Sequence, residues 1–258
     1  MFEFATKLQE RLGKGYLSYS SVKYALQDMR LFEMYMAGQL KKEGDHFAFG
    51  NLYDDMIFNR DAINDKYIVF DDSEMIAKLV KDGSKSPRST TEYKKWRQEM
   101  LADSDTKIVV SAEDFDTCYG MYSRLEETGI LDTYLKGSYQ VEFNDFIDDV
   151  PVRGFLDCKG DTFITDLKTT RDANGLRYDI RKLGYDIQAY IYTKVFATED
   201  YYWVGQEKAY PYLPVVYQAK PETIQAGKFK FEQAVERINH YLNTPEESSS
   251  SFFYFDYV

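Results

Sequence analysis

The chain has 258 residues, of which 44% are hydrophobic and 17% aromatic, so it can bury a sizeable core without disulfides. Its formal net charge of −11 gives no overall attraction to polyanions, so any nucleic-acid contact must come from a local groove. It has only two cysteines, Cys118 and Cys158, which are too few for a four-cysteine iron–sulphur cluster or a structural zinc site.

The amino terminus carries no charged-then-apolar leader pattern, and no run approaches the ~18 apolar residues of a membrane span. We therefore expect a cytoplasmic protein with no membrane partner.

Helical apolar periodicity dominates the first part of the chain, residues 1–137. Short strands are expected at 67–70 and 107–110, and a loop rich in Gly, Ser and Pro at 82–89. The helices that the periodicity predicts cover residues 2–12, 20–41, 49–63, 90–101 and 112–127.

From residue 138 to 242 the pattern changes to three strands, a helix to about 196, two further strands and a long helix. The last three elements are expected at 202–207, 213–218 and 221–242. This order predicts an α/β fold with a mixed central sheet flanked by helices, following the mostly helical N-terminal half. We treat residues 1–258 as one domain with a tail at 243–258. The aromatic end of the tail, Phe252 to Phe255, either packs on its own domain or docks on another subunit.

A β-hairpin is the most informative stretch. β-Branched and aromatic residues predict strands at 152–158 and 162–168, with a turn centred on Gly160 and Asp161.

Acidic residues lie on both strands of this hairpin. Side chains alternate along a strand, so Asp166 and Lys168 share a face. With an even-numbered loop, Asp157 lies opposite Ile164 and joins them. Two carboxylates then converge beside one ammonium group.

This arrangement suits hydrolysis of a phosphodiester. Mg²⁺ prefers oxygen ligands and is usually held by one or two carboxylates plus substrate phosphate. It acidifies water and neutralises charge on the phosphate, while Lys168 orients the water or stabilises the developing negative charge. The spacing alone fits a solvated hairpin equally well, because Asp-x-Lys is a common sequence.

The order of motifs resembles the PD-(D/E)XK nuclease superfamily, and within it the RecE-type and RecB-like exonucleases of phages and recombination systems. The resemblance covers about residues 17–241 and implies a restriction-endonuclease-like core. The matching motifs are Glu142 in the strand 139–143, Gly154-Phe-Leu-Asp157, Asp166-Leu-Lys-Thr169 and Gln188-Ala-Tyr-Ile-Tyr192.

The resemblance implies catalytic roles for Glu142, Asp157, Asp166 and Lys168. It also implies a metal held by Asp157, Asp166 and the backbone carbonyl of Leu167. The expected cofactor is Mg²⁺, with Mn²⁺ as the alternative and without an iron–sulphur cluster.

One position departs from the family pattern. The family carries a metal-binding histidine in a run such as Phe-Gly-x-x-x-His, and the matching run here, Phe49-Gly-Asn-Leu-Tyr-Asp54, ends in an aspartate. A carboxylate suits Mg²⁺ and Mn²⁺, so we expect Asp54 to be a further metal ligand.

Contacts to DNA are expected from two groups of residues. Gln188 and Tyr192 share one helical face toward the active site, although an amphipathic helix with a buried tyrosine shows the same spacing. Three arginines lie between the Asp-x-Lys strand and this helix: Arg171, Arg177 and Arg181. They either bind the DNA backbone or form a solvent-exposed helix face.

The resemblance implies a metal-dependent exonuclease that digests duplex DNA from its ends in phage recombination or DNA processing. The expected partners are DNA, a single-strand annealing recombinase and further copies of the chain, in the host cytoplasm if a phage encodes it. The alternatives are an endonuclease or repair nuclease on the same fold, and a catalytically quiet DNA-binding assembly protein.

Overall fold

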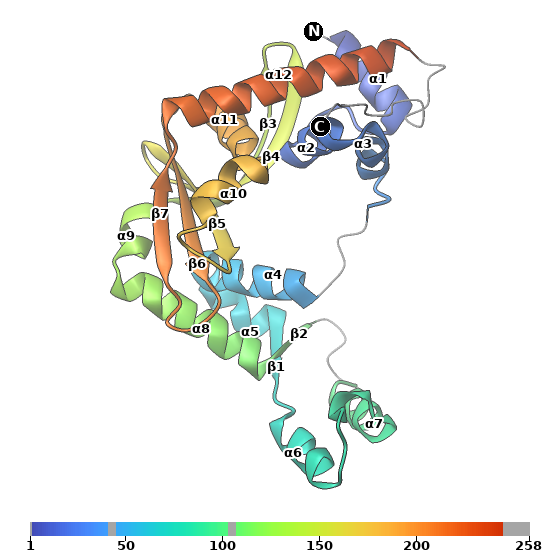
Figure 1. Ribbon diagram of the computed structural model, residues 1–258, viewed down its shortest axis with the longest axis vertical. Coiled ribbons are helices and arrows are strands. Elements are labelled where there is room, and N and C mark those ends of the chain that lie inside the picture. Colours follow the sequence, from blue (N-terminus) through green and yellow to red (C-terminus); the bar gives the residue numbers. More distant parts are fainter. Residues whose placement is uncertain (1, 41–44, 103–106, 245–258) are drawn as a thin grey trace, which may run out of the picture. The chain divides into compact units, whose positions relative to one another are not determined.

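The computed structural model describes residues 2–40, 45–102 and 107–244 (Figure 1). By its contacts the chain divides into two compact units. Unit 1 comprises Met1–Lys42, Thr128–Glu207 and Leu213–Val258, and unit 2 comprises Glu43–Glu127 and Lys208–Tyr212. The helices of residues 2–40 therefore belong to the same unit as the predicted catalytic strands. That residues 1–258 form one domain stays a prediction. The aromatic end of the tail, 252–255, lies outside the described residues.

Within its described residues, unit 1 contains a five-stranded sheet in the order β3-β4-β5-β6-β7. Only β5 and β6 pair in parallel, and they are joined through α10 and α11, as a parallel connection requires. This confirms the predicted mixed α/β architecture. The strands are β3 Ser138–Ile147, β4 Val150–Lys159, β5 Phe163–Thr170, β6 Asp200–Glu207 and β7 Pro214–Gln218.

Helix α11 forms the centre of unit 1. It packs against β3, β6 and α12, and most of its side chains are buried. At Gly227 of α12 the two helices meet so closely that a Cβ there would lie 2.0 Å from the carbonyl oxygen of Asp186. Asp186 is itself fully buried and pairs with Lys230 at 2.8 Å. The helices of unit 1 are α1 Phe2–Leu12, α2 Tyr19–Gln27, α3 Met29–Met36, α9 Ile130–Tyr134, α10 Leu176–Lys182, α11 Tyr185–Phe196 and α12 Pro221–Asn243.

Unit 2 is mostly helical around a short parallel pair of strands, β1 and β2. Its core includes Leu52, Tyr53, Met121 and Leu125, all at most 1% exposed. Its elements are α4 Asp45–Phe58, η1 Arg60–Ala62, α5 Ile63–Lys66, β1 Tyr67–Phe70, α6 Ser73–Lys81, η2 Pro87–Ser89, α7 Thr91–Met100, β2 Ile108–Ser111 and α8 Ala112–Glu127.

Three predicted elements differ from the structure. The helix expected at 49–63 begins at Asp45 and ends at Phe58, and η1 and α5 follow it. The single helix expected at 20–41 is broken at Asp28, whose backbone is extended and whose side chain caps α3 by accepting a hydrogen bond from the Arg30 amide at 2.8 Å. The loop expected at 82–89 ends in η2, where Arg88 forms an ion pair with Asp72.

Three helices, α6, α9 and α10, were not predicted. None of the helices in the described residues combines the length and the apolar character needed to cross a membrane.

Candidate active site

The β4–β5 hairpin brings the predicted acidic residues together. Its loop is closed by a hydrogen bond from the Gly160 amide to the carbonyl of Phe163, and the observed pairs are Cys158↔Thr165 and Lys159↔Ile164. The prediction that Asp157 lies opposite Ile164 is therefore wrong by two residues, because the loop contains four residues rather than two. Because side chains alternate along a strand, a register shift of two residues leaves Asp157 on the predicted face of the hairpin.

Asp157 lies where the ladder between β4 and β5 ends. Extending the register by one step places it opposite Asp166. Its Oδ2 accepts a hydrogen bond from the backbone amide of Leu167 at 2.8 Å. The Asp157 carboxylate thus pairs with the strand amide of the residue that follows Asp166.

Asp166 is held from two directions. Its side chain is only 2% exposed, and its Oδ2 lies 2.5 Å from Nζ of Lys168. Its Oδ1 accepts a hydrogen bond of 2.7 Å from Nε2 of Gln188. Burial raises the pKa of Asp166, and the nearby ammonium group of Lys168 opposes this shift. We refer to Asp157, Asp166 and Lys168 as the carboxylate–lysine cluster.

Lys168 remains a cation in this environment. Burial alone would lower the pKa of its amine, but the charges of Asp166 and Asp157 outweigh burial and raise that pKa above its ordinary value. Its Nζ also lies 4.9 Å from the ring centre of Tyr185, a residue that the motifs do not include. The two acids therefore favour the protonated form of Lys168.

Gln188 and Tyr192 support the cluster from α11. Both side chains are buried, with 7% and 5% exposure. The hydroxyl of Tyr192 donates to the carbonyl of Phe155 at 2.9 Å and accepts from Nε2 of Gln188 at 3.3 Å. The pair links β4 to Asp166 on β5. Contact of these two residues with DNA stays a prediction.

Glu142 is placed on β3, opposite Phe155 of β4. Its Oε1 accepts hydrogen bonds from Nε, at 2.8 Å, and from an Nη atom of Arg153, which also donates to the hydroxyl of Tyr16 at 3.1 Å. Sequence reasoning missed Arg153 and Tyr16, because a pair across two strands leaves no local spacing signal. The catalytic role of Glu142 stays a prediction.

Asp54 lies on α4 in unit 2, and its role as a metal ligand stays a prediction. Its neighbour Asp55 has a structural role within the same unit. Asp55 pairs with Lys66 at 2.7 Å and accepts a hydrogen bond from the hydroxyl of Tyr67 at 2.8 Å.

The donor chemistry of the cluster fits a hard cation. Carboxylate and carbonyl oxygens are the ligands that Mg²⁺ and Mn²⁺ prefer, and Mg²⁺ needs only one or two carboxylates from the protein. In the described residues no three His, Cys, Asp or Glu side chains come together as a metal-binding group. Asp157, Asp166 and the carbonyl of Leu167 stay the predicted ligands in unit 1.

The three predicted arginines also belong to unit 1. Arg171 lies in the loop after β5, and Arg177 and Arg181 lie on α10. All three are exposed. Their contact with DNA stays a prediction.

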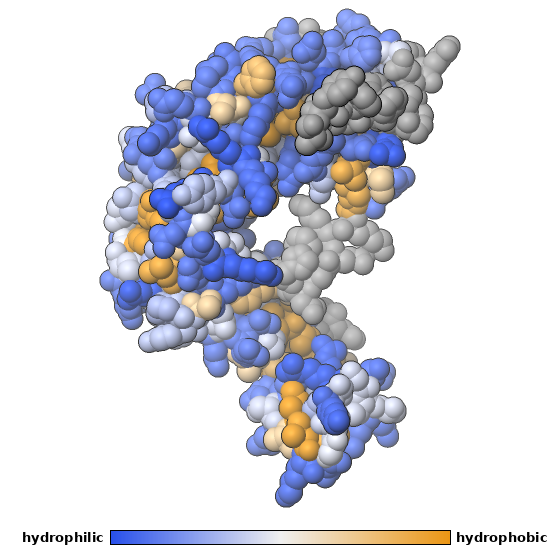
Figure 2. Space-filling view, in the orientation of Figure 1, coloured by the Kyte–Doolittle hydropathy of each residue, from blue (hydrophilic) through white to orange (hydrophobic). Residues whose placement is uncertain are grey.

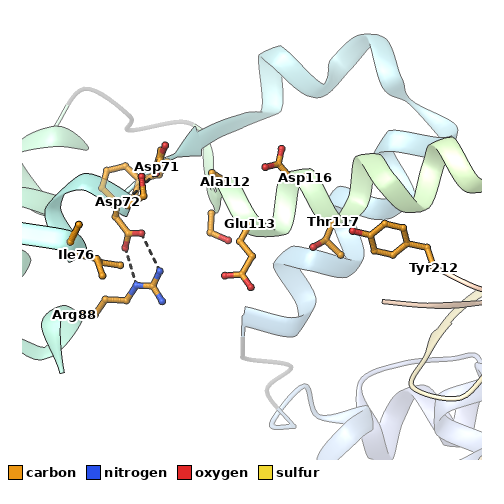
Figure 3. Close-up of a pocket in the computed structure, with 13 residues that line it drawn as sticks. Asp71, Asp72, Ile76, Arg88, Ala112, Glu113, Asp116, Thr117 and Tyr212 are labelled. Atoms are coloured by element: carbon orange, nitrogen blue, oxygen red, sulfur yellow. Dashed lines mark hydrogen bonds and ion pairs between the residues drawn. The ribbon is translucent and has the colours of Figure 1, made fainter. Parts of the chain in front are cut away.

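Unit 2 contains a separate cavity of about 680 Å³ (Figure 3). Its walls carry several acids, among them Glu113 and Asp116 of α8. Its one arginine, Arg88, forms the ion pair with Asp72 drawn in Figure 3. Acidic side chains at helix N-termini complement the helix dipole, so this lining has a structural explanation. None of the predicted site residues lines the cavity.

Comparisons with known proteins identify the family and the fold. The sequence profile of the "PDDEXK-like domain of unknown function (DUF3799)" matches residues 18–251. No curated protein sequence matches the chain significantly. Among solved structures, a protein from Eubacterium rectale that has been proposed to be an exonuclease superposes with a TM-score of 0.62 at 15% identity, over 95% of this chain and 86% of that one. A phage-related exonuclease from Haemophilus somnus 129PT covers 64% of this chain and 90% of its own, with a TM-score of 0.35 and 14% identity.

Proposed function

The chain belongs to the PDDEXK-like family DUF3799, and we propose that it is a metal-dependent nuclease that hydrolyses DNA from its ends. The observation that carries the proposal is the carboxylate–lysine cluster. Asp157 and Asp166 are fixed beside each other by the Leu167 amide and by Gln188, and a lysine that stays charged lies within 2.5 Å of one of them. Two acids beside an ammonium group suit phosphodiester hydrolysis, because the acids can hold a cation and the ammonium group can stabilise negative charge on the phosphate.

Each residue of the cluster has a distinct part. Asp157 and Asp166 would hold the cation, which supplies an acidified water and neutralises charge on the phosphate when it is bound. Gln188 orients Asp166 through its 2.7 Å hydrogen bond and keeps the carboxylate from rotating. The two acids raise the pKa of the Lys168 amine, and its side chain would orient the attacking water or stabilise the negative charge that develops on the phosphate.

Digestion from ends is the finer part of the proposal. It draws on the similar structure from Eubacterium rectale, a protein that has been proposed to be an exonuclease. We further propose a cytoplasmic protein that assembles as a homo-oligomer and passes single strands to an annealing recombinase, with Mg²⁺ as the cofactor and Mn²⁺ as a substitute.

The test compares a linear duplex with covalently closed circles of the same sequence, with Mg²⁺ and with EDTA. The proposal predicts progressive loss of the linear duplex only with Mg²⁺, while closed circles survive. Nicking or linearisation of the circles would identify an endonuclease instead. Binding without hydrolysis of either substrate would identify a catalytically quiet DNA-binding protein.

A further inference from the structure

Helix α10 presents an unusual surface for a protein of net charge −11. With α10 at about 100° per residue, Arg177, Tyr178, Arg181 and Lys182 fall within an arc of about 140°. Leu176 and Ile180, on the opposite side, are 2% and 6% exposed. The helix therefore buries its aliphatic side and turns one aromatic and three basic side chains to the solvent. Figure 2 shows a strongly hydrophilic surface where Figure 1 places α10.

The basic side chains of this surface lack acidic partners. Among the described residues, Arg171, Arg177, Arg181 and Lys182 form no ion pair with a carboxylate. Elsewhere in the chain many basic side chains are neutralised, among them Lys66 by Asp55. Unpaired cations grouped on one helix and its leading loop form a site for several phosphates.

Tyr178 adds a feature that phosphate binding does not need. Its side chain is 69% exposed, and the guanidinium carbon of Arg177 lies 4.9 Å from its ring centre. An exposed ring of this kind offers a flat surface for stacking. An unpaired base can stack on it, whereas the interior base pairs of an intact duplex are already stacked on both faces.

The surface is rigidly attached to the catalytic strand. Leu176 packs so tightly on β6 that a Cβ at Gly205 would lie 2.3 Å from it. At the other end of the helix, Lys230 donates to the carbonyl of Arg181 at 2.9 Å, and the hydroxyl of Tyr19 donates to the carbonyl of Leu183 at 2.8 Å. The loop before α10 continues directly from β5, which carries Asp166 and Lys168.

We infer that Arg171, Arg177, Tyr178, Arg181 and Lys182, the α10 patch, bind a single-stranded segment of DNA. The cations contact successive phosphates and Tyr178 stacks on one base. The inference rests on the proposed function in one respect, that DNA is the ligand. It specifies the substrate class, a DNA end with an unpaired strand.

The test measures binding in EDTA, where hydrolysis is excluded, by fluorescence anisotropy of a labelled oligo-dT of about 20 nucleotides and of a duplex of equal length. Tyr178→Ala is expected to weaken oligo-dT binding about tenfold, the effect of losing one stacked base, and to change duplex binding less than about twofold. Tyr178→Phe keeps the ring and should bind like the wild type. The matched control is Tyr119→Ala on α8, since Tyr119 is also exposed and also lies beside an arginine, 5.9 Å from Arg60.

Substituting a basic residue of the patch gives a second measurement, the salt dependence of DNA affinity. Arg181→Ala should weaken binding of both DNA forms and lower the slope of log affinity against log salt by about 0.7 for the single strand. Lys94→Ala, an exposed lysine on α7, should leave the slope unchanged.

Three results would overturn the inference: Tyr178→Ala behaving like Tyr119→Ala, equal losses for the single strand and the duplex, or no oligo-dT binding by the wild type. These results distinguish a failure of this inference from a failure of the proposed function. A protein that binds oligo-dT through Tyr178 but hydrolyses no DNA refutes the nuclease and keeps the patch. A protein that hydrolyses DNA while Tyr178→Ala binds normally refutes the patch alone.

Discussion

Removing the charge of Lys168 should reduce stability as well as activity, because the residue compensates a buried carboxylate. Asp166 is 2% exposed at its side chain and has Lys168 at 2.5 Å. Breaking a buried ion pair by removing one partner typically costs about 3–5 kcal/mol. Since the Lys168 side chain remains 19% exposed, we expect Lys168→Met to lower the free energy of unfolding by about 3 kcal/mol near neutral pH.

The loss of unfolding free energy caused by Lys168→Met should grow as pH rises. Without Lys168 the pKa of Asp166, already raised by burial, rises further above its ordinary value of 3.8. Between the unfolded and the folded pKa, the folded variant holds a proton that the unfolded chain has released. Its stability therefore falls as pH rises, by at most about 1.4 kcal/mol per pH unit. The difference from the wild type should thus be smallest near pH 4 and reach its full size only above the folded pKa of Asp166.

Urea unfolding of the wild type, Lys168→Met and the double variant Asp166→Asn/Lys168→Met, at several pH values, checks this reasoning. The double variant removes both charges of the buried pair and leaves only Asp157, which is less buried than Asp166, so it should recover much of the lost stability and lose most of the pH dependence. A Lys168→Met protein as stable as the wild type at neutral pH, or a loss that does not change with pH, would refute the account of the pair.

The remaining predictions concern packing and the metal. Gly227→Ala should destabilise the protein by about 1–3 kcal/mol in urea unfolding, because its Cβ would lie 2.0 Å from the Asp186 carbonyl. Gly50→Ala on α4, which has nothing within 4 Å of the new Cβ, should be neutral or stabilising by about 0.5–1 kcal/mol, and equal effects would contradict the packing argument. Asp54→Ala should raise the metal concentration for half-maximal hydrolysis, and Asp54→His should shift the preference toward Mn²⁺. The control is Asn51→Ala, an exposed position on the same helix; Asp55→Ala is unsuitable because Asp55 pairs with Lys66. Equal metal dependence of Asp54→Ala and Asn51→Ala would show that Asp54 is not a ligand.

Local patterns in the sequence predicted the regular elements well. The helices at 2–12 and 112–127 and the strand at 67–70 have the predicted limits, because periodicity and capping are local properties. The α8 start, for example, is fixed by the side chain of Ser111, which accepts a hydrogen bond from the Asp114 amide at 3.0 Å. The short helix α10 escaped prediction, since seven residues give little periodic signal.

The arrangement of the site depends on contacts that no local pattern encodes. Motif order identified Asp157, Asp166, Lys168 and Gln188, but the burial of Asp166 depends on how α11 packs on the sheet. The Arg153–Glu142 pair and the ring of Tyr185 beside Lys168 likewise come from segments brought together only by folding. For the same reason, the sequence could not predict that Asp166 would be buried inside β5.

The central claim is that the carboxylate–lysine cluster is a nuclease active site. The most direct test measures the rate at which nucleotides are released from linear duplex DNA with Mg²⁺. It compares the wild type with Asp157→Asn and Asp161→Asn. Asp157→Asn keeps an oxygen that can accept the Leu167 hydrogen bond but removes the charge that would hold the cation. Asp161 lies exposed in the loop of the same hairpin and serves as the matched control. The account predicts that Asp157→Asn loses at least about a hundredfold in rate while remaining folded and that Asp161→Asn keeps the wild-type rate. An Asp157→Asn protein that degrades DNA at the wild-type rate would contradict it.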